Sequence, residues 1–193
     1  AIAGACHPAS PYTRDEVEEY NGDVWSAGGS LSLRRQFVGG AGTQNAAVAW
    51  GGTIYPTPQK LTEEYNGSAW ASANDLPRTL NGQSGNAIGT QTATLAIGNS
   101  SPGANATGSF AYDGLNWSNS SLHPNAIVVP KSVGSQNSAI TIAGYHPHCR
   151  QTSFWDGSIW SEGPLTINEF NFGGAAGTQN SAYATMCDDS NFW

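Results

Sequence analysis

Small apolar and polar residues alternate along the chain in short runs that end at glycine turns. Runs such as AAVAW from Ala46 and ATLAI from Ala93 have the small and β-branched side chains that fit a strand buried between neighbouring sheets. A second type of run, TEEYNGSAW from Thr62, places an Asn-Gly pair between two segments, which is a strong short-range signal for a β-hairpin. The pattern therefore predicts short strands joined by tight turns.

Two markers recur in a fixed order along the chain and reveal an internal repeat. The first is an aromatic residue followed by Asn or Asp and then Gly, with a tryptophan at a constant distance behind it, and it recurs at intervals of about 45 residues. The second is a glycine turn that leads into a small and apolar run, as in GTQNAAVAWGG. The chain therefore contains four copies of one unit. The first marker begins at Tyr20, Tyr65, Tyr112 and Trp155, and the second at Gly42, Gly89, Gly134 and Gly177.

A single unit of this kind cannot bury both faces of its sheet, so the units are expected to stack as blades. Radial stacking leaves only short strand edges exposed. The expected fold class is all-β: a small β-propeller of four blades in one domain, with about four short antiparallel strands in each blade. The units are expected near 27–73, 74–120 and 121–163, and a fourth near 164–193 is completed by 1–26.

Composition favours strands and turns over helices. Only 11% of the 193 residues are charged, whereas glycine and small polar residues are abundant. The formal net charge of −7 repels phosphate backbones and anionic lipid head groups, so nucleic acid is not an expected partner. No apolar run approaches the ~18 residues that span a bilayer, so membrane insertion is not expected, and the first residues lack the pattern of a signal peptide.

The order of these markers resembles the kelch repeat. Its parts here are Leu76-Pro77-Arg78, the Gly-terminated strand at Trp50-Gly51-Gly52, a Tyr-containing strand and the tryptophan behind it. EEYNGSAW, GTQNAAVAWGG and the segment from Gly28 to Leu31 are similar to kelch-like repeats in virion and tail-associated proteins of phages that infect marine cyanobacteria. The resemblance covers nearly the whole chain and implies a propeller on a tail, fibre or capsid surface. The third unit departs from the pattern, with Ala143-Gly144 in place of the double glycine.

The two ends of the chain are expected to close the ring. Residues near 15–26 supply the outer half of a blade and residues near 166–186 the inner half, so they are predicted to form one shared blade. Cys6 and Cys187 would then be close enough for a disulfide clasp. Three unpaired thiols are the alternative. The likeness between the first residues and the last strand agrees equally with a longer array of repeats.

Candidate reactive groups do not match a known catalytic pattern. His146, His148 and Cys149 are three potential zinc ligands in one loop, but local hydrogen bonding explains the histidines as well, so no metal or other cofactor is expected. No nucleophile-elbow motif is present. The acidic residues are interpreted as solvated strand faces rather than as a glycosidase pair, and no enzymatic activity is expected. These acids are Asp15, Glu16, Glu18, Glu19, Glu63 and Glu64.

The tryptophans could stack on sugar rings, but most of their positions indicate packing. Trp50 and Trp155 lie in predicted strands and are expected in the core, while Trp193 could anchor the tail to a partner. The four tryptophans of the repeat are expected to pack between blades: Trp25, Trp70, Trp117 and Trp160.

Variable loops on a regular scaffold are where binding usually concentrates. We therefore expect a non-enzymatic structural or adhesion protein of a phage virion, with other virion proteins or a host-surface glycan as partners, and a homo-oligomer is left open. A cellular or secreted, extracellular kelch-type module for protein interaction or carbohydrate binding is the alternative. The candidate contact residues in the loops are Tyr55, Gln59, Lys60, Asn99, Asn105, Tyr145, His146 and His148.

Overall fold

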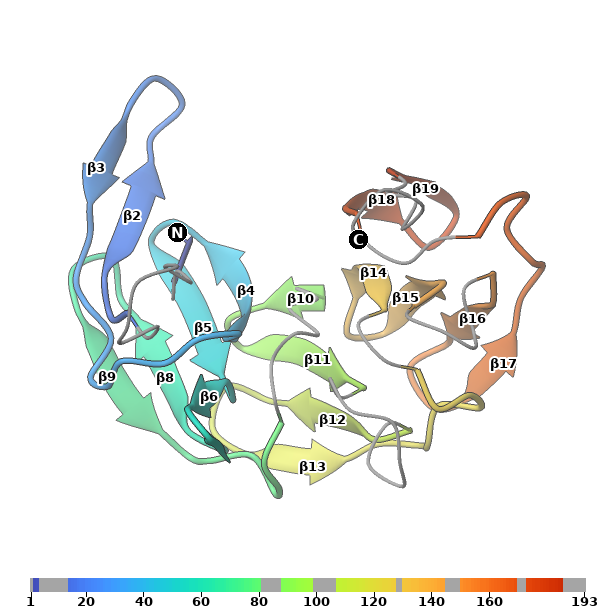
Figure 1. Ribbon diagram of the computed structural model, residues 1–193, viewed down its shortest axis with the longest axis horizontal. Helices are drawn as coiled ribbons and strands as arrows, with labels where there is room; N and C mark the ends of the chain where they lie inside the picture. Colours follow the sequence, from blue (N-terminus) through green and yellow to red (C-terminus); the bar gives the residue numbers. More distant parts are fainter. Residues whose placement is uncertain are drawn as a thin grey trace.

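The computed structural model describes residues 2–3, 14–80, 88–98, 107–127, 130–144, 150–169 and 173–185. Within these ranges, all the regular elements are β-strands, so the predicted all-β class is confirmed. Figure 1 shows that the strands form small antiparallel sheets, which follow one another around an arc. The described part of the chain has no helix that could cross a membrane.

Three of the sheets have four strands each and share one design: the strands follow the chain order, and neighbours are antiparallel. Sheet I contains β4 (Gly39–Thr43), β5 (Ala46–Trp50), β8 (Thr62–Tyr65) and β9 (Trp70–Ala73). Sheet II contains β10 (Ile88–Thr90), β11 (Ala93–Ile97), β12 (Ser109–Tyr112) and β13 (Trp117–Asn119). Sheet III contains β14 (Lys131–Ser135), β15 (Ser138–Ile142), β16 (Thr152–Trp155) and β17 (Trp160–Glu162).

Smaller sheets lie at the two ends of the array. The N-terminal sheet has the order β1 (Ile2–Ala3), β2 (Val17–Tyr20) and β3 (Trp25–Ala27). In the C-terminal sheet, β18 (Ala175–Thr178) pairs with β19 (Ser181–Ala184). A short hairpin of β6 (Thr53–Ile54) and β7 (Thr57–Pro58) is inserted between β5 and β8 of sheet I.

The last two strands of each unit are joined at the predicted hairpin turn. In all four copies, the side-chain Oδ1 of the Asn or Asp that opens the turn accepts hydrogen bonds from two backbone N–H groups farther along, at 2.6–3.0 Å. This local bonding holds the tight turn, and the following glycine supplies the positive φ that it requires. The four residues are Asn21, Asn66, Asp113 and Asp156.

The core lies between successive sheets. The first strands β4, β10, β14 and β18 contact one another in succession near the middle of the arc. Val48 and Trp50 of sheet I are buried in one apolar cluster with Tyr112 of sheet II. Leu95 of sheet II is buried in a second cluster with Trp155 of sheet III. The expected core positions of Trp50 and Trp155 are therefore confirmed.

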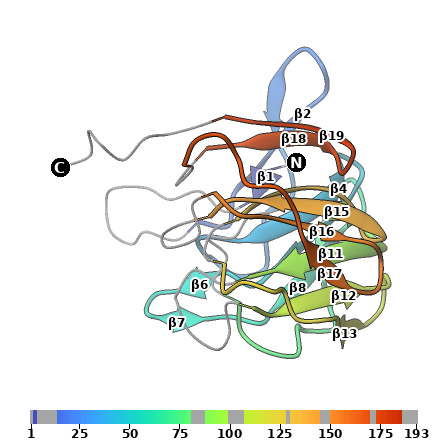
Figure 2. The same cartoon turned by 90° about the vertical axis from the view of Figure 1, so that its right-hand side faces the viewer.

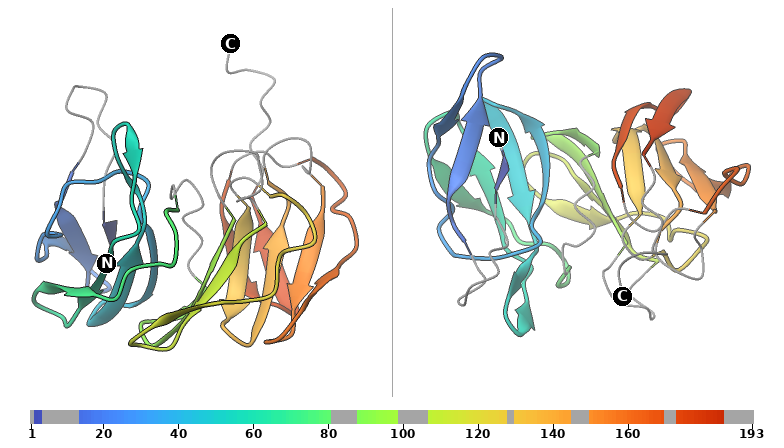
Figure 3. Two further views of the ribbon diagram at one scale, coloured as in Figure 1. Left: turned by 90° about the horizontal axis from the view of Figure 1, so that it is seen from below. Right: turned by 45° about the horizontal axis from the view of Figure 1, so that its top comes forward.

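The two ends of the array do not pair with each other in the described residues, so the expected shared blade stays a prediction. Val17 and Glu18 of β2 pair with Ala3 and Ile2 of β1, and β19 pairs with β18. The reason is that β1 fills, on β2, the place that β5 fills on β8. Figures 1 and 3 show the two end sheets on opposite sides of the opening of the arc.

Candidate functional site

A glutamine in the turn between the first two strands of a unit joins it to the unit before. Gln91 Nε2 donates hydrogen bonds to the carbonyl oxygens of Ala47 and Tyr65, at 3.0 and 2.8 Å. Gln136 reaches sheet II in the same way, and Gln179 reaches sheet III, at 2.6–3.0 Å. Because each amide binds carbonyls on two adjacent strands, it fixes the position of one sheet against the next. We call this contact the glutamine staple.

Gln44, the first copy of this glutamine, makes a different contact. Its Nε2 donates to Glu19 Oε2 at 3.1 Å, and the hydroxyl of Tyr65 donates to the other carboxylate oxygen. These bonds, chiefly that from Tyr65, lower the pKa of Glu19, and the carboxylate raises the pKa of Tyr65. One unit later, the Tyr112 hydroxyl donates to Glu64 at 3.0 Å, and burial together with this bond raises the pKa of Tyr112.

The expectation of solvated acidic strand faces is therefore wrong for three of the acids. Glu19 and Glu64 each accept a hydrogen bond from a tyrosine of the following sheet. Glu63 is only 1% exposed and forms an ion pair with Arg35, with 2.7 Å between its Oε1 and the guanidinium Nη2. All three carboxylates therefore make structural contacts, and the buried charge of Glu63 is tolerated because it has such a partner.

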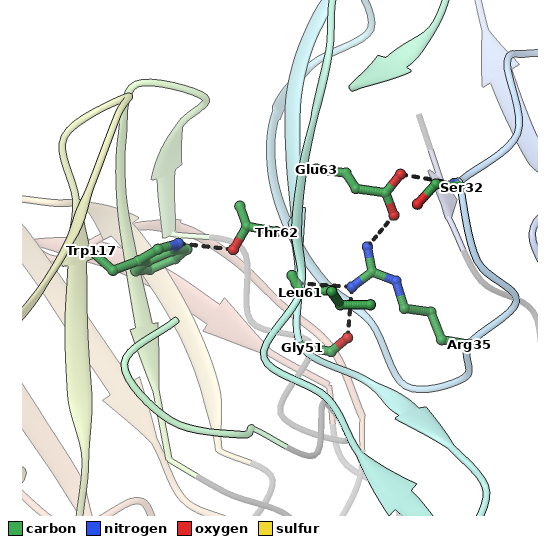
Figure 4. Close-up of polar contacts among 7 residues, drawn as sticks. All are labelled: Ser32, Arg35, Gly51, Leu61, Thr62, Glu63 and Trp117. Carbon is green, nitrogen blue, oxygen red and sulfur yellow. Dashed lines mark hydrogen bonds and ion pairs between the residues drawn. The ribbon is translucent and has the colours of Figure 1, made fainter. Parts of the chain in front are cut away.

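Arg35 lies at the foot of the β6–β7 hairpin. Figure 4 shows its guanidinium between the Glu63 carboxylate and the backbone. Nη1 donates to the carbonyl oxygens of Gly51 and Leu61, at 2.8 and 2.9 Å, while the N–H of Ser32 donates to the second oxygen of Glu63 at 2.8 Å. Burial lowers the pKa of Arg35, and the Glu63 carboxylate opposes that shift. The guanidinium thus joins the ends of the two strands from which the hairpin projects.

The tryptophan that begins the last strand of a unit contacts the sheet before it. Trp117 Nε1 donates to Thr62 Oγ1 at 2.9 Å (Figure 4). Trp160 Nε1 donates to Ser109 Oγ, which is at the equivalent position of sheet II, at 3.3 Å. Both indoles are buried, so the predicted packing between units is confirmed for them.

The other two copies of this tryptophan differ. Trp70 Nε1 is buried without a hydrogen-bond partner among the described residues, because Val17 stands where sheets I and II have a hydroxyl. Trp25 is 53% exposed and packs on Tyr20, with 5.2 Å between ring centroids. The expected burial is wrong for Trp25, because it lies in the first unit and no preceding sheet covers it.

The connections between second and third strands leave one end of the sheets. They start from equivalent paired residues, and in sheet I the connection contains the β6–β7 hairpin, which projects from that end (Figure 2). The strand ends that flank the three predicted recognition loops therefore lie at one end of the array. The paired residues are Trp50 and Thr62, Ile97 and Ser109, and Ile142 and Thr152.

Among the candidate contact residues that the structure describes, Tyr55 is the most exposed, at 76%. It lies in the turn of the β6–β7 hairpin. Backbone hydrogen bonds of 3.0 and 2.8 Å between Gln36 and Thr53 attach the hairpin to the preceding segment. An aromatic ring is thus held out from the scaffold.

Gln59 and Lys60 have structural contacts. The N–H of Gln59 donates to Gly52 at 2.8 Å, and its side-chain amide donates to Thr57 at 2.8 Å. Lys60 is exposed, and its Nζ lies 3.6 Å from a carboxylate oxygen of Asp75. Gln59 therefore supports the hairpin, whereas the ammonium group of Lys60 remains at the surface, where ion pairs are weak.

The other predicted site residues lie outside the described ranges: Asn99, Asn105, Tyr145, His146, His148 and Cys149. Cys6 and Cys187 lie outside them as well, so their disulfide stays a prediction. Within the described ranges, no group of three or more His, Cys, Asp or Glu side chains is placed to hold a metal ion.

A groove opens on the face of sheet III toward the C-terminal sheet. It is lined on sheet III mainly by apolar side chains, and β19 contributes alanines to its other side. On sheets I and II, the aromatic pair of the following unit covers the equivalent face. The side chains that line the groove include Ile140, Thr152, Leu165 and Ile167, and Ile167 is 90% exposed.

The staples and the buried ion pair were not predicted from the sequence. The sequence does contain a signal for the glutamine staples, because glutamine is the one large polar side chain that recurs in all four glycine turns. No comparable signal marks Arg35 or Glu63, because no other unit has this pair at the same positions.

Comparison with known proteins adds evidence on the fold. No family model and no curated protein matches the sequence. Among solved structures, YjhT is similar to 94% of this chain over 72% of its own length, with a TM-score of 0.72 and 13% sequence identity. At that identity, the likeness shows a shared fold alone.

Proposed function

We propose that this chain is a kelch-like β-propeller module that acts without catalysis as an adhesion or structural component on the tail, fibre or capsid surface of a phage virion. Sheets I, II and III are three of its blades. The fourth combines the C-terminal strands β18 and β19 with the N-terminal hairpin β2–β3. The similarity of the repeats to those of phage virion proteins supports this location.

One observation carries the proposal of a binding scaffold. Several polar side chains of the repeat are used in contacts between sheets, as the staple of Gln91 and the carboxylate of Glu64 illustrate. The long connections leave one end of these sheets, and there Tyr55 is held out on a hairpin. A stiff array with an exposed aromatic residue at one end fits recognition by contact.

The expected partner of this end is a host-surface glycan or another virion protein. An exposed tyrosine ring covers the apolar face of a sugar, and its hydroxyl can bond to the sugar's hydroxyl groups. A tyrosine is also a frequent anchor of protein interfaces. Both partners use the same end of the scaffold, so one variant tests both.

The location is tested by fractionating purified phage particles and detecting the chain by mass spectrometry. We expect it at a constant ratio to the capsid protein. Recovery of the chain only in the soluble, particle-free fraction contradicts the proposal and favours a cellular or secreted module.

Binding is tested with the whole chain on a glycan array and on immobilised virion proteins. Tyr55→Ala is expected to weaken the observed binding at least about tenfold, because it removes the exposed ring. Leu115→Ala is the matched control, because Leu115 is 65% exposed in the turn at the opposite end of β12. Equal loss in both variants, or no binding to either surface at high micromolar concentration, contradicts recognition through this end.

A further inference from the structure

We propose that the groove on sheet III binds the β2–β3 hairpin of a second copy of this chain, so that two chains share each fourth blade. The inference rests on the proposed propeller architecture and identifies what completes it. The groove is lined mainly by apolar side chains. The hairpin presents Tyr20 and Trp25, which are 46% and 53% exposed.

The same kind of contact already occurs within the chain. Tyr112 and Trp117 of sheet II are buried against Val48 of sheet I, and the aromatic pair of sheet III is buried against sheet II. Ile140 holds on sheet III the place that Val48 holds on sheet I. The groove beside Ile140 is therefore where the aromatic pair of another unit fits.

The hydrogen-bond acceptor for a further indole is already in place. Ser109 Oγ donates to the carbonyl oxygen of Ser121 at 2.8 Å and accepts the indole N–H of Trp160. Thr152 Oγ1 donates in the same way to the carbonyl oxygen of Pro164, at 2.6 Å. Because this bond uses the hydroxyl proton, the oxygen lining the groove keeps lone pairs for an incoming N–H.

The strand edges and the glutamine staple of the two chains are also compatible with this contact. In the register of sheets I to III, Ala182 of β19 would lie opposite Tyr20 of β2. Gln44 of the second copy could then donate to the carbonyl oxygens of these two residues, as the other three glutamines do, instead of to Glu19. In this pairing, β19 of one chain takes the edge of β2 that β1 holds in the single chain.

A second copy fits better than the chain's own hairpin. Within one chain, β2–β3 lies at the other end of the arc from the groove (Figures 1 and 3). Its inner face is already packed on sheet I through Val17, Leu31 and Trp70. In two chains joined head to tail, the hairpin of each chain would occupy the groove of the other. The two equal contacts then close a ring of about eight blades, within the known range for propellers.

The experiment measures the mass of the whole chain by light scattering and sedimentation over a range of concentrations. We expect the wild type at twice the chain mass of 20.1 kDa. Trp25→Glu in the hairpin and Ile167→Glu in the groove should each weaken the dimer at least about tenfold, because each buries a charge in the apolar contact. Leu115→Glu is the control, because Leu115 is also exposed, at 65%, but does not line the groove.

A mixture of the two variants decides between one chain and two. Each variant keeps one intact surface: Trp25→Glu keeps its groove, and Ile167→Glu keeps its hairpin. If the contact joins two chains, mixing restores a heterodimer held by one intact contact. If the hairpin closed on its own chain, mixing would change nothing. Circular dichroism of each variant alone verifies that its strands are formed, and Thr152→Val supplies a milder variant of the groove.

Three results would overturn the proposal. The first is a wild type that stays monomeric at all concentrations, whether Trp25 is then buried by its own chain or exposed to fluorescence quenchers. The second is dimerisation that both variants leave intact. The third is a mixture that stays monomeric although both variants are folded. A monomer that still binds virion particles or glycans leaves the proposed function standing, so the two failures are distinguishable.

Discussion

Trp117 on β13 of sheet II donates its indole N–H to the hydroxyl oxygen of Thr62 on β8 of sheet I, and the distance between Nε1 and Oγ1 is 2.9 Å. One unit earlier, the same positions hold Trp70 and Val17, and there the buried indole nitrogen has no partner among the described residues. A buried N–H group without an acceptor costs about 1–3 kcal/mol. At this position, the contact between the N-terminal sheet and sheet I therefore lacks a hydrogen bond that the contact between sheets I and II has.

We predict that Val17→Thr raises the free energy of unfolding by about 1 kcal/mol, because its hydroxyl supplies the missing acceptor for Trp70. Thr62→Val should lower it by about 1–3 kcal/mol, because the indole of Trp117 loses its acceptor. Urea denaturation followed by tryptophan fluorescence measures both changes. Equal destabilisation by the two substitutions would show that the hydroxyl is not what distinguishes the two contacts.

The ion pair between Arg35 and Glu63 gives a second matched comparison. The equivalent residues one unit later are Leu80 and Phe110, which are buried in the cluster between sheets I and II. Glu63→Phe alone leaves a buried guanidinium without its carboxylate and should cost about 3–5 kcal/mol. The double substitution of Arg35→Leu with Glu63→Phe copies the apolar pair and should be close to neutral.

A double-mutant cycle on the free energy of unfolding measures the coupling. Strong coupling is expected, because the two single substitutions each strand a buried charge. Additive effects of the two substitutions would contradict the structural role assigned to the pair. The binding of glycans or virion proteins, which we assign to Tyr55, serves as a second readout of these variants. Arg35 binds the carbonyl oxygen of Gly51 next to the β6–β7 hairpin, so its loss should also affect the hairpin.

The strands and hairpin turns could be predicted because their signals are local. An Asn-Gly pair between alternating segments specifies a hairpin wherever it stands, as at Asn66. The environment of Glu63 could not be predicted, because Arg35 approaches it from 28 residues away and alternation does not say which strand face a neighbouring sheet will cover. Trp25 differs from Trp117 for a related reason: its sequence context is the same, but its unit is at the end of the array.

The candidate site was predicted only as a set of loops. The register of sheets I to III places the strand ends that flank these loops at one end of the array, and a repeated sequence allows that register to be inferred once the strands are paired. The exposure of Tyr55 and the supporting bonds of Gln59 depend on contacts with the segment around Gln36. Such contacts between irregular segments leave no periodic trace in the sequence.

Ala143 provides a prediction about backbone strain. Its φ is 54°, where the equivalent Gly51 and Gly98 have φ values of 63° and 76°. A left-handed conformation costs a residue with a Cβ atom about 1–2 kcal/mol. Ala143→Gly should therefore raise the free energy of unfolding by about 1 kcal/mol, after allowance for the greater freedom of glycine in the unfolded chain.

Ala139→Gly is the control for Ala143→Gly, because Ala139 is buried in the extended strand β15. There the loss of the methyl group and the added freedom of the unfolded chain should destabilise the protein. Thermal unfolding of both variants gives the comparison. A lower midpoint for Ala143→Gly than for the wild type would contradict the assignment of strain.

The hairpin turns of sheets II and III should make stability depend on acid pH. Backbone N–H groups, chiefly that of Asn116 for Asp113 and that of Ile159 for Asp156, lower the pKa of both carboxyl groups. A lowered pKa in the folded state adds stability above the ordinary pKa of aspartate, and this contribution is lost as the pH falls through the lowered value. The first two turns have asparagine at this position and carry no such dependence. We therefore predict that the wild type loses stability more steeply below about pH 4 than the variant with Asp113→Asn and Asp156→Asn. Urea denaturation at a series of pH values measures the two slopes, and parallel slopes would show that these carboxylates do not contribute to the acid sensitivity.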